Sequence, residues 1–139
     1  MQPKTNMTME KQHLQAAIQV ANAQVKASLE VYLFEEEGTR IAYCPALNLS
    51  AYGTTLEDAK SEFAQILKEY LEDCIRQDTL IADLSAHGWK IQPKKYVAPI
   101  ATDMLIANET LRDIVNNRVY RKMMLPTSWR RSTRSHARA

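Results

Sequence analysis

The sequence has few of the residues from which catalytic and metal-binding sites are commonly built. It contains three histidines, two cysteines and three glycines in 139 residues. The histidines, at positions 13, 87 and 136, lie far apart, and none stands at a motif spacing from a cysteine, serine or aspartate. Glycine-rich phosphate-binding loops, G-x-S-x-G elbows and HExxH motifs are also missing. We therefore expect a protein that is not an enzyme, with no catalytic residue, no cofactor and no metal.

Long apolar runs and clustered cysteines are missing as well. No run approaches the roughly 18 residues of a membrane-spanning helix, and the N-terminus lacks the apolar region of a secretory signal. Cys44 and Cys74 lie in apolar settings without a CxxC spacing, which favours buried free thiols over a disulfide or a zinc site. The composition, 45% hydrophobic and 24% charged, is typical of a soluble globular protein. We expect a cytoplasmic protein without a membrane segment.

Charge is distributed unevenly along the chain. Residues 118–139 carry seven Lys and Arg and no acidic residue, whereas residues 1–117 carry 11 Lys and Arg against all 16 acidic residues. An acidic body with a basic end can meet two kinds of partner, a basic protein and a polyanion. An aromatic plane next to guanidinium groups can stack on bases and contact phosphates. We weigh DNA binding through Trp129, Arg130, Arg131 and Arg134 against a basic tail that serves only solubility.

Three segments in the first half of the chain have the pattern of β-strands. Residues 25–33 alternate, with Lys26, Ser28, Glu30 and Tyr32 on the polar face. A polar turn follows, in which Gly38 is free to adopt positive φ, and residues 39–44 return as a second strand. Pro45 cannot donate to a ladder, so the chain turns before residues 47–51 resume the alternation. The pattern predicts an antiparallel sheet of three strands.

A long amphipathic helix is predicted after Gly53. Thr55 is a natural N-cap, and Asp58 stands three residues later, as in a capping box. From residue 56 to residue 75 apolar side chains recur at spacings of three and four, which indicates about six helical turns. Residues 80–84 then suggest a short second helix that ends near a glycine.

The C-terminal part predicts a short helix followed by a strand. Asn108 can cap a helix that contains Leu111 and Ile114. Residues 119–125 alternate, and we expect them to form an added strand at a sheet edge or across a subunit boundary. At the N-terminus, Leu14, Ala17, Ile18 and Ala21 fit one amphipathic helix, and an unstructured leader is the alternative.

The expected fold class is α+β. A small antiparallel three-stranded sheet packs on a long amphipathic helix, and a C-terminal short helix and an added strand follow. The expected organisation is an N-terminal leader (1–23), a main domain (24–92), a helix–strand extension (93–127) and a flexible basic tail (128–139).

One segment of the sequence has the pattern of a known family. An acidic turn ending in glycine, a Tyr-Cys-Pro-x-Leu segment, a second glycine and a threonine-capped Glu-Asp-Ala helix start follow one another within residues 35–59. The residues that carry this pattern are Gly38, Ala42, Tyr43, Cys44, Pro45, Leu47, Gly53, Thr55, Glu57 and Ala59. Together with the flanking strand and helix, residues 25–92 resemble the HicB-like family of antitoxins.

The resemblance implies a partial RNase H-like fold and a role in a toxin–antitoxin system. Family members bind and inhibit a small HicA toxin, an mRNA-cleaving protein, by protein–protein contact. The acidic body has the sign of charge needed to cover a basic, RNA-binding toxin. The alternative is a stand-alone HicB-like oligomeric scaffold or regulator that binds nucleic acid through its basic C-terminal tail.

Two groups of residues are candidates for protein contacts. For the toxin interface we expect Tyr43, Tyr52, Glu69 and Glu72, against the alternatives of core packing for the tyrosines and solvation for the glutamates. For homo-oligomerisation, as a dimer or a larger assembly, we expect Val119, Met123 and Leu125 of the added strand.

Overall fold

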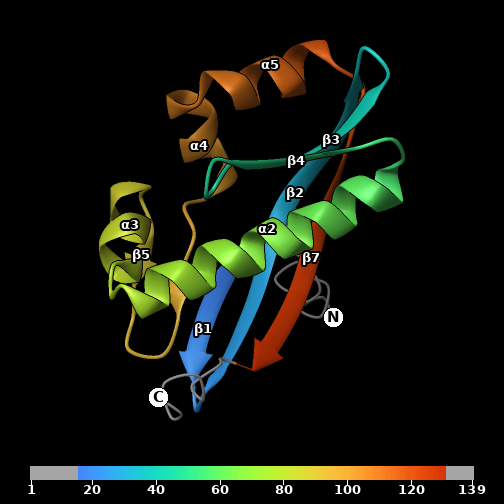
Figure 1. Ribbon diagram of the computed structural model, residues 1–139. Coiled ribbons are helices and arrows are strands. Elements are labelled where there is room, and N and C mark those ends of the chain that lie inside the picture. Colours follow the sequence, from blue (N-terminus) through green and yellow to red (C-terminus); the bar gives the residue numbers. More distant parts are fainter. Residues whose placement is uncertain (1–15, 131–139) are drawn as a thin grey trace, which may run out of the picture.

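A computed structural model describes residues 16–130 of the protein. In this range seven strands form one antiparallel sheet that carries four helices, an α+β architecture (Figure 1). The strands are β1 (Ala17–Ala21), β2 (Gln24–Glu36), β3 (Thr39–Cys44), β4 (Leu49–Gly53), β5 (Lys90–Ile91), β6 (Tyr96–Val97) and β7 (Tyr120–Arg130). The helices are α2 (Leu56–Arg76), α3 (Leu80–Ala86), α4 (Ala101–Ala107) and α5 (Glu109–Asn117).

Strand β2 is the axis of the sheet. It has 13 residues, and β7 pairs with it from Gln24↔Arg130 to Phe34↔Tyr120. One end of β2 also pairs with β1, and the other end pairs with β3. Because a strand has only two edges, β1 and β3 share the edge opposite β7. The sheet continues from β3 to β4 and from β1 to β6 and β5.

Tight turns connect the strands around β2. The β2–β3 turn consists of Glu37 and Gly38, with φ values of 50° and 85°. The β1–β2 turn consists of Asn22 and Ala23, with φ values of 47° and 61°. Positive φ at both central residues is typical of two-residue turns that match the twist of a hairpin. The predicted turn at Gly38 is therefore confirmed.

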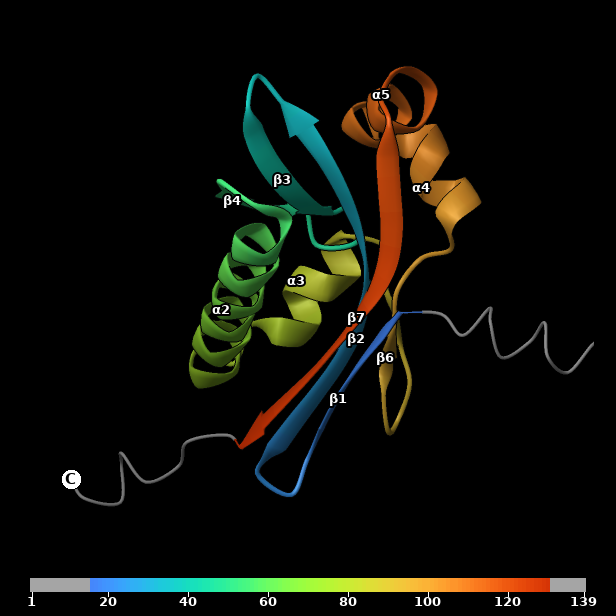
Figure 2. The same cartoon turned by 90° about the vertical axis from the view of Figure 1, so that its right-hand side faces the viewer.

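Helix α2 covers one face of the sheet, as Figure 2 shows. It begins as predicted, because the Thr55 side chain accepts a hydrogen bond from the Asp58 amide at 3.0 Å. Gly53 lies directly under the first turn, where an added Cβ would be 2.6 Å from the Ala59 nitrogen. The buried residues of α2 are Ala59, Phe63, Leu67, Leu71 and Cys74, and they join the main core with the odd-numbered residues of β2 from Val25 to Leu33.

Helices α4 and α5 lie on the opposite side of the sheet (Figure 2). Asn108 caps α5 as predicted, since its side chain accepts a hydrogen bond from the Leu111 amide at 2.9 Å. Helix α4 was not predicted. A second core cluster on this side consists of Tyr32, Phe34, Ile41, Tyr43, Leu111 and Ile114.

Several sequence-based expectations about the fold are wrong. The sheet of the described chain has seven strands instead of the predicted three and one added strand, because β1, β5 and β6 also join it. Residues 17–21 form β1 instead of a helix, and Ile18 is fully buried. Residues 128–130, placed in the tail, belong to β7. The remaining parts of the leader and of the tail, residues 1–15 and 131–139, lie outside the described residues.

Within residues 16–130, no helix has the length and apolar character needed to cross a membrane.

Candidate functional site

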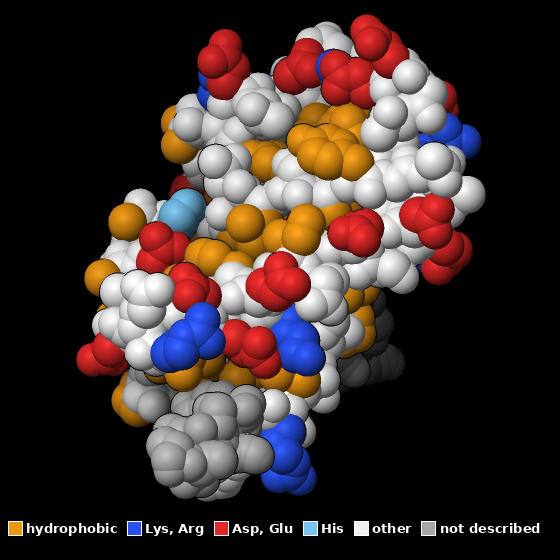
Figure 3. All heavy atoms as spheres, viewed as in Figure 1, with side chains coloured by type: hydrophobic (Ala, Val, Ile, Leu, Met, Phe, Trp, Pro, Cys, Tyr) orange, Lys and Arg blue, Asp and Glu red, His pale blue; other side chains and the backbone are white. Residues whose placement is uncertain are grey.

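One face of the molecule combines an apolar band with acidic surroundings. Figure 3 shows hydrophobic side chains gathered between α5 and α2, with acidic side chains over both helices. Strand β4 borders this region, and among the described strands only β3 pairs with it. Its residue Tyr52 is 59% exposed, so most of its aromatic ring is open to solvent.

Tyr52 extends the second core cluster to the surface. It stands opposite Ile41 in the β3–β4 ladder, so both side chains lie on the sheet face that carries α5. Ile41 is buried in the cluster with Leu111 and Ile114. Tyr52 therefore offers an exposed aromatic ring at the end of a packed apolar cluster, next to a strand edge that no described strand covers.

The acidic residues of α2 differ in their local neutralisation. Glu57 pairs with Lys60 at 3.2 Å, and Asp73 pairs with Arg76 at 2.9 Å. Glu62, Glu69 and Glu72 have no ion pair with any described residue, although Glu69 accepts a hydrogen bond from Gln65. The outer surface of α2 therefore keeps three carboxylates whose charge is available to a partner.

Three acidic residues near α5 are neutralised within the chain. Arg118 contacts Asp113 at 3.1 Å and Glu36 at 3.4 Å, and Arg40 contacts Glu35 at 3.0 Å. Hydrogen bonds from Asn117 and Arg118 hold the pKa of Asp113 below its ordinary value. The Arg118–Glu36 pair connects α5 to the β2–β3 hairpin, whereas Glu37 and Glu109 have no ion pair with a described residue.

The four residues expected at the toxin interface are not brought together. Tyr43 is buried, at 4% exposure, and its hydroxyl donates to Asn48 at 3.0 Å and accepts from Asn108 at 2.9 Å. Burial raises the pKa of Tyr43. Tyr52 is exposed on the α5 side of the sheet, whereas Glu69 and Glu72 lie on α2. Of the two tyrosines, only Tyr52 offers its ring to a partner.

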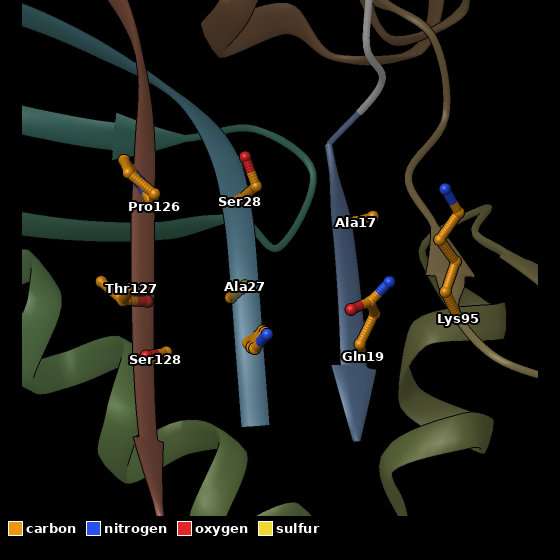
Figure 4. Close-up of a pocket in the computed structure, with 9 residues that line it drawn as sticks. Ala17, Gln19, Ala27, Ser28, Lys95, Pro126, Thr127 and Ser128 are labelled. Carbon is orange, nitrogen blue, oxygen red and sulfur yellow. The ribbon is translucent and has the colours of Figure 1, made fainter. Parts of the chain in front are cut away.

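A second candidate surface is the half of the α5-side sheet face that no helix covers. Here a groove of about 450 Å³ is lined from four segments, by Gln19, Lys26, Ser28, Lys95, Pro126 and Ser128 among others (Figure 4). The register places Gln19 beside Lys26 and Lys26 beside Ser128, so these side chains form one row across β1, β2 and β7. The groove offers ammonium, hydroxyl and amide groups, which suit an anionic, hydrogen-bonding ligand.

The two described residues that are expected to bind nucleic acid lie on different faces of β7. Trp129 stands opposite Val25 and packs against the main core, and its Nε1 atom is buried without a hydrogen-bond partner among the described residues. Arg130 follows on the other face, at the end of β7 near the groove, and is exposed. Arg131 and Arg134 lie outside the described residues. The expected stacking role of Trp129 is therefore not matched by its partly buried position.

The residues expected at the oligomer interface all lie on or next to β7. Met123 and Leu125 are partly buried and pack against the main core, opposite Val31 and Leu29. Val119 directly precedes β7 and is 95% exposed. The predicted added strand completes the sheet of its own chain, and it lies at a sheet edge, since β2 is its only partner among the described strands.

One polar cluster was missed by sequence reasoning. The Tyr70 hydroxyl of α2 donates to Asp83 of α3, and His87 Nδ1 lies 2.9 Å from the backbone oxygen of Asp83. Burial, followed by the hydrogen bond to Asp83, raises the pKa of Tyr70. The spacing of four residues between Asp83 and His87 was the available signal. The contacts join α2 to α3, and the buried Cys74 thiol lies beside Tyr70.

The two cysteines are placed as predicted for structural thiols. Both are free and buried, and burial raises the pKa of Cys44 to about 12, so its thiol stays protonated at neutral pH. Among residues 16–130, no cluster of three or more His, Cys, Asp or Glu side chains has an arrangement that could hold a metal ion.

No protein-family model, curated protein or solved structure matches the chain. Function is therefore inferred from the sequence pattern and from the two surfaces described above.

Proposed function

We propose that the protein is a HicB-like antitoxin-type protein, which binds and neutralises a small basic, HicA-like mRNA-cleaving toxin by protein–protein contact. One observation carries the proposal: the meander β2–β3–β4 and the Thr55-capped helix α2 occur at the residues whose pattern resembles that family. In this role the protein is not an enzyme, and it acts in the cytoplasm with its toxin.

The surface around Tyr52 supports a basic protein as the partner. A large exposed aromatic ring beside an apolar band is a typical centre of a protein interface. Glu62, Glu69 and Glu72 of α2 lack ion pairs with described residues, so they can attract and orient a basic partner. The free edge of β4 also offers backbone groups with which an extended segment of the partner can pair.

Co-purification from the native cells tests the proposal. We expect a tagged full-length chain to retain a small basic protein at high salt, because the centre of the contact is apolar. Replacing Tyr52→Ala should weaken this contact about 30-fold, the effect of an interface residue worth about 2 kcal/mol. The matched control is Ile81→Ala on α3, which removes a side chain that is 50% exposed away from this surface. If both variants retain the small basic protein equally, Tyr52 does not lie in the interface.

A second candidate function, nucleic-acid binding through the basic C-terminal end, is favoured by the open groove. Lys26, Lys95 and Arg130 lie at or near this groove, at the end of β7 from which the basic tail continues. Phosphate contacts release counterions, so bound nucleic acid should be lost steeply as salt rises. Recovery of nucleic acid at low salt, with no small basic protein at high salt, would favour this second function over the first.

A further inference from the structure

We propose that the outer edge of β7 pairs antiparallel with the outer edge of β7 in a second copy of this chain. The result is a two-fold dimer in which the two sheets form one continuous sheet. The partner is a second copy because the edge is complementary to itself.

Strand β7 is the longest edge strand of the described sheet. It has 11 residues and pairs only with β2, whereas the edge strands β4 and β5 have five and two residues. An uncovered edge presents a row of free N–H and C=O groups that can pair with another strand. Proteins usually keep such edges short or cover them, and β7 is neither short nor covered by another described strand.

One face of β7 is incompletely covered by its own chain. Met123, Leu125 and Trp129 remain partly exposed, although their cross-strand partners on β2 are at most 1% exposed. Val119, at the position before β7, falls on the same side as these residues in the alternation of the strand and is 95% exposed. These four residues form an apolar strip along the edge, which a second subunit would complete.

One register matches this strip to itself. If Met124 stands opposite Met124 of the second copy, Met123 faces Leu125 and Val119 faces Trp129 across the two-fold axis. Such self-complementarity is required of a two-fold interface. Apolar cross-strand pairs of this kind stabilise a ladder.

Within β7 itself, the same register places no two charged side chains opposite each other. Arg130 faces Arg118, which precedes β7 and is already paired with Glu36 and Asp113. Lys122 faces Pro126, and Arg121 faces Thr127, whose hydroxyl oxygen is buried without a partner among the described residues. A register centred on Lys122 would instead place two ammonium groups directly opposite each other, which is unfavourable. Pro126 lacks an N–H group, so it costs the new ladder at most one donor per subunit.

The mass of the purified full-length chain in solution tests the dimer. We expect twice the chain mass of 15.9 kDa by sedimentation or light scattering. Val119→Asp should weaken the dimer at least tenfold, with unchanged circular dichroism because this side chain is exposed in the single chain. The matched control is Ile106→Asp on α4, also exposed at 77%, which should leave the dimer intact. A monomeric wild type, or equal masses for the two variants, would overturn the proposal.

A cysteine cross-link tests the register. Directly opposed residues of an antiparallel pair have Cβ atoms about 4.5–5.5 Å apart, within reach of a disulfide after a small adjustment. Met124→Cys should therefore form a covalent dimer on mild oxidation, whereas Ser128→Cys should not, since it faces Tyr120. The native thiols, Cys44 and Cys74, are buried and serve as the internal blank. Faster cross-linking of Ser128→Cys than of Met124→Cys would contradict the register. Both experiments use the chain alone and do not depend on a toxin.

Discussion

The α5-side face of the sheet has two halves that share strands β2 and β7 and differ in whether a helix covers them. In one half, Tyr32 and Phe34 are buried under α5. In the other half, Lys26, Ser28 and Glu30 lie on the same face of β2. They are exposed or half-buried, with no helix above them. Figure 2 shows α4 and α5 at one end of this face only.

The difference shows how a change of side chains along one strand can divide a surface into a core and an open candidate surface. The backbone pairing is continuous, because β7 accompanies β2 through both halves. Only the side chains change, from polar to aromatic, between Glu30 and Tyr32. The covered half therefore contributes stability, and the open half and the exposed Tyr52 at the border are available to partners.

The largest effect should come from opening the covered half. Leu111 is fully buried, so Leu111→Ala should lower the free energy of unfolding by about 2–5 kcal/mol through lost burial and a cavity. Lys26→Ala in the open half is the matched control and should change the free energy of unfolding by less than about 0.5 kcal/mol. Urea denaturation measures both. Similar losses for the two variants would abolish the distinction between the halves.

A smaller effect is expected from the hydrogen bonds inside the covered half. Tyr43→Phe removes the hydroxyl that joins Asn48 to Asn108, which should cost about 0.5–1.5 kcal/mol. Tyr120→Phe is the control, because its ring contacts Tyr32 but its hydroxyl has no hydrogen bond to the described residues. An unchanged free energy of unfolding for Tyr43→Phe would mean that water replaces these hydrogen bonds without loss of stability.

Alkaline pH should weaken the covered half specifically. Burial, with smaller contributions from Glu30 and Tyr120, raises the pKa of Tyr32 from 10.0 to about 12. The unfolded phenol ionises first, so this contribution to stability is complete below about pH 10 and is lost as pH rises through about 12. Unfolding free energies measured against pH should therefore fall in this window. The free energy of unfolding of Tyr32→Phe should fall less steeply with pH than that of the wild type. Equal slopes for the two proteins would show that Tyr32 is solvated.

The smallest effect on stability should come from the open groove. Replacing Lys26→Gln and Lys95→Gln together should leave the free energy of unfolding within about 0.5 kcal/mol of the wild type. If this face contacts nucleic acid, the slope of log K against log salt should fall by about 0.9 for each lysine that contacts a phosphate. Lys60→Gln with Lys68→Gln on α2 provides the control pair. An unchanged slope would exclude the groove from phosphate contact.

Local signals in the sequence predicted local structure well. The caps at Thr55 and Asn108 and the turn at Gly38 depend on residues within three positions of each other, and all three are confirmed. Strand β1 was predicted as a helix or a leader because Ala17, Ile18 and Ala21 have helical spacing. Its strand conformation depends on pairing with β2 through the Asn22–Ala23 turn, which periodicity alone does not reveal.

The candidate sites depend on long-range neighbours and were predicted less well. Tyr32 was assigned to the polar face of β2, and its burial follows from α5, about 80 residues later in the chain. Tyr43 and Tyr52 look alike in the sequence, yet only β3 lies under α5, whereas β4 is an edge. Trp129 was grouped with its arginine neighbours, although alternation along β7 directs it to the other face.

The intact mass of the complex purified from native cells tests the proposed function most directly. We predict a species that contains the 15.9 kDa chain together with a small basic protein, stable at high salt and lost in Tyr52→Ala. Recovery of only the chain and its multiples would contradict the account. So would a protein partner that Tyr52→Ala retains as well as the wild type does.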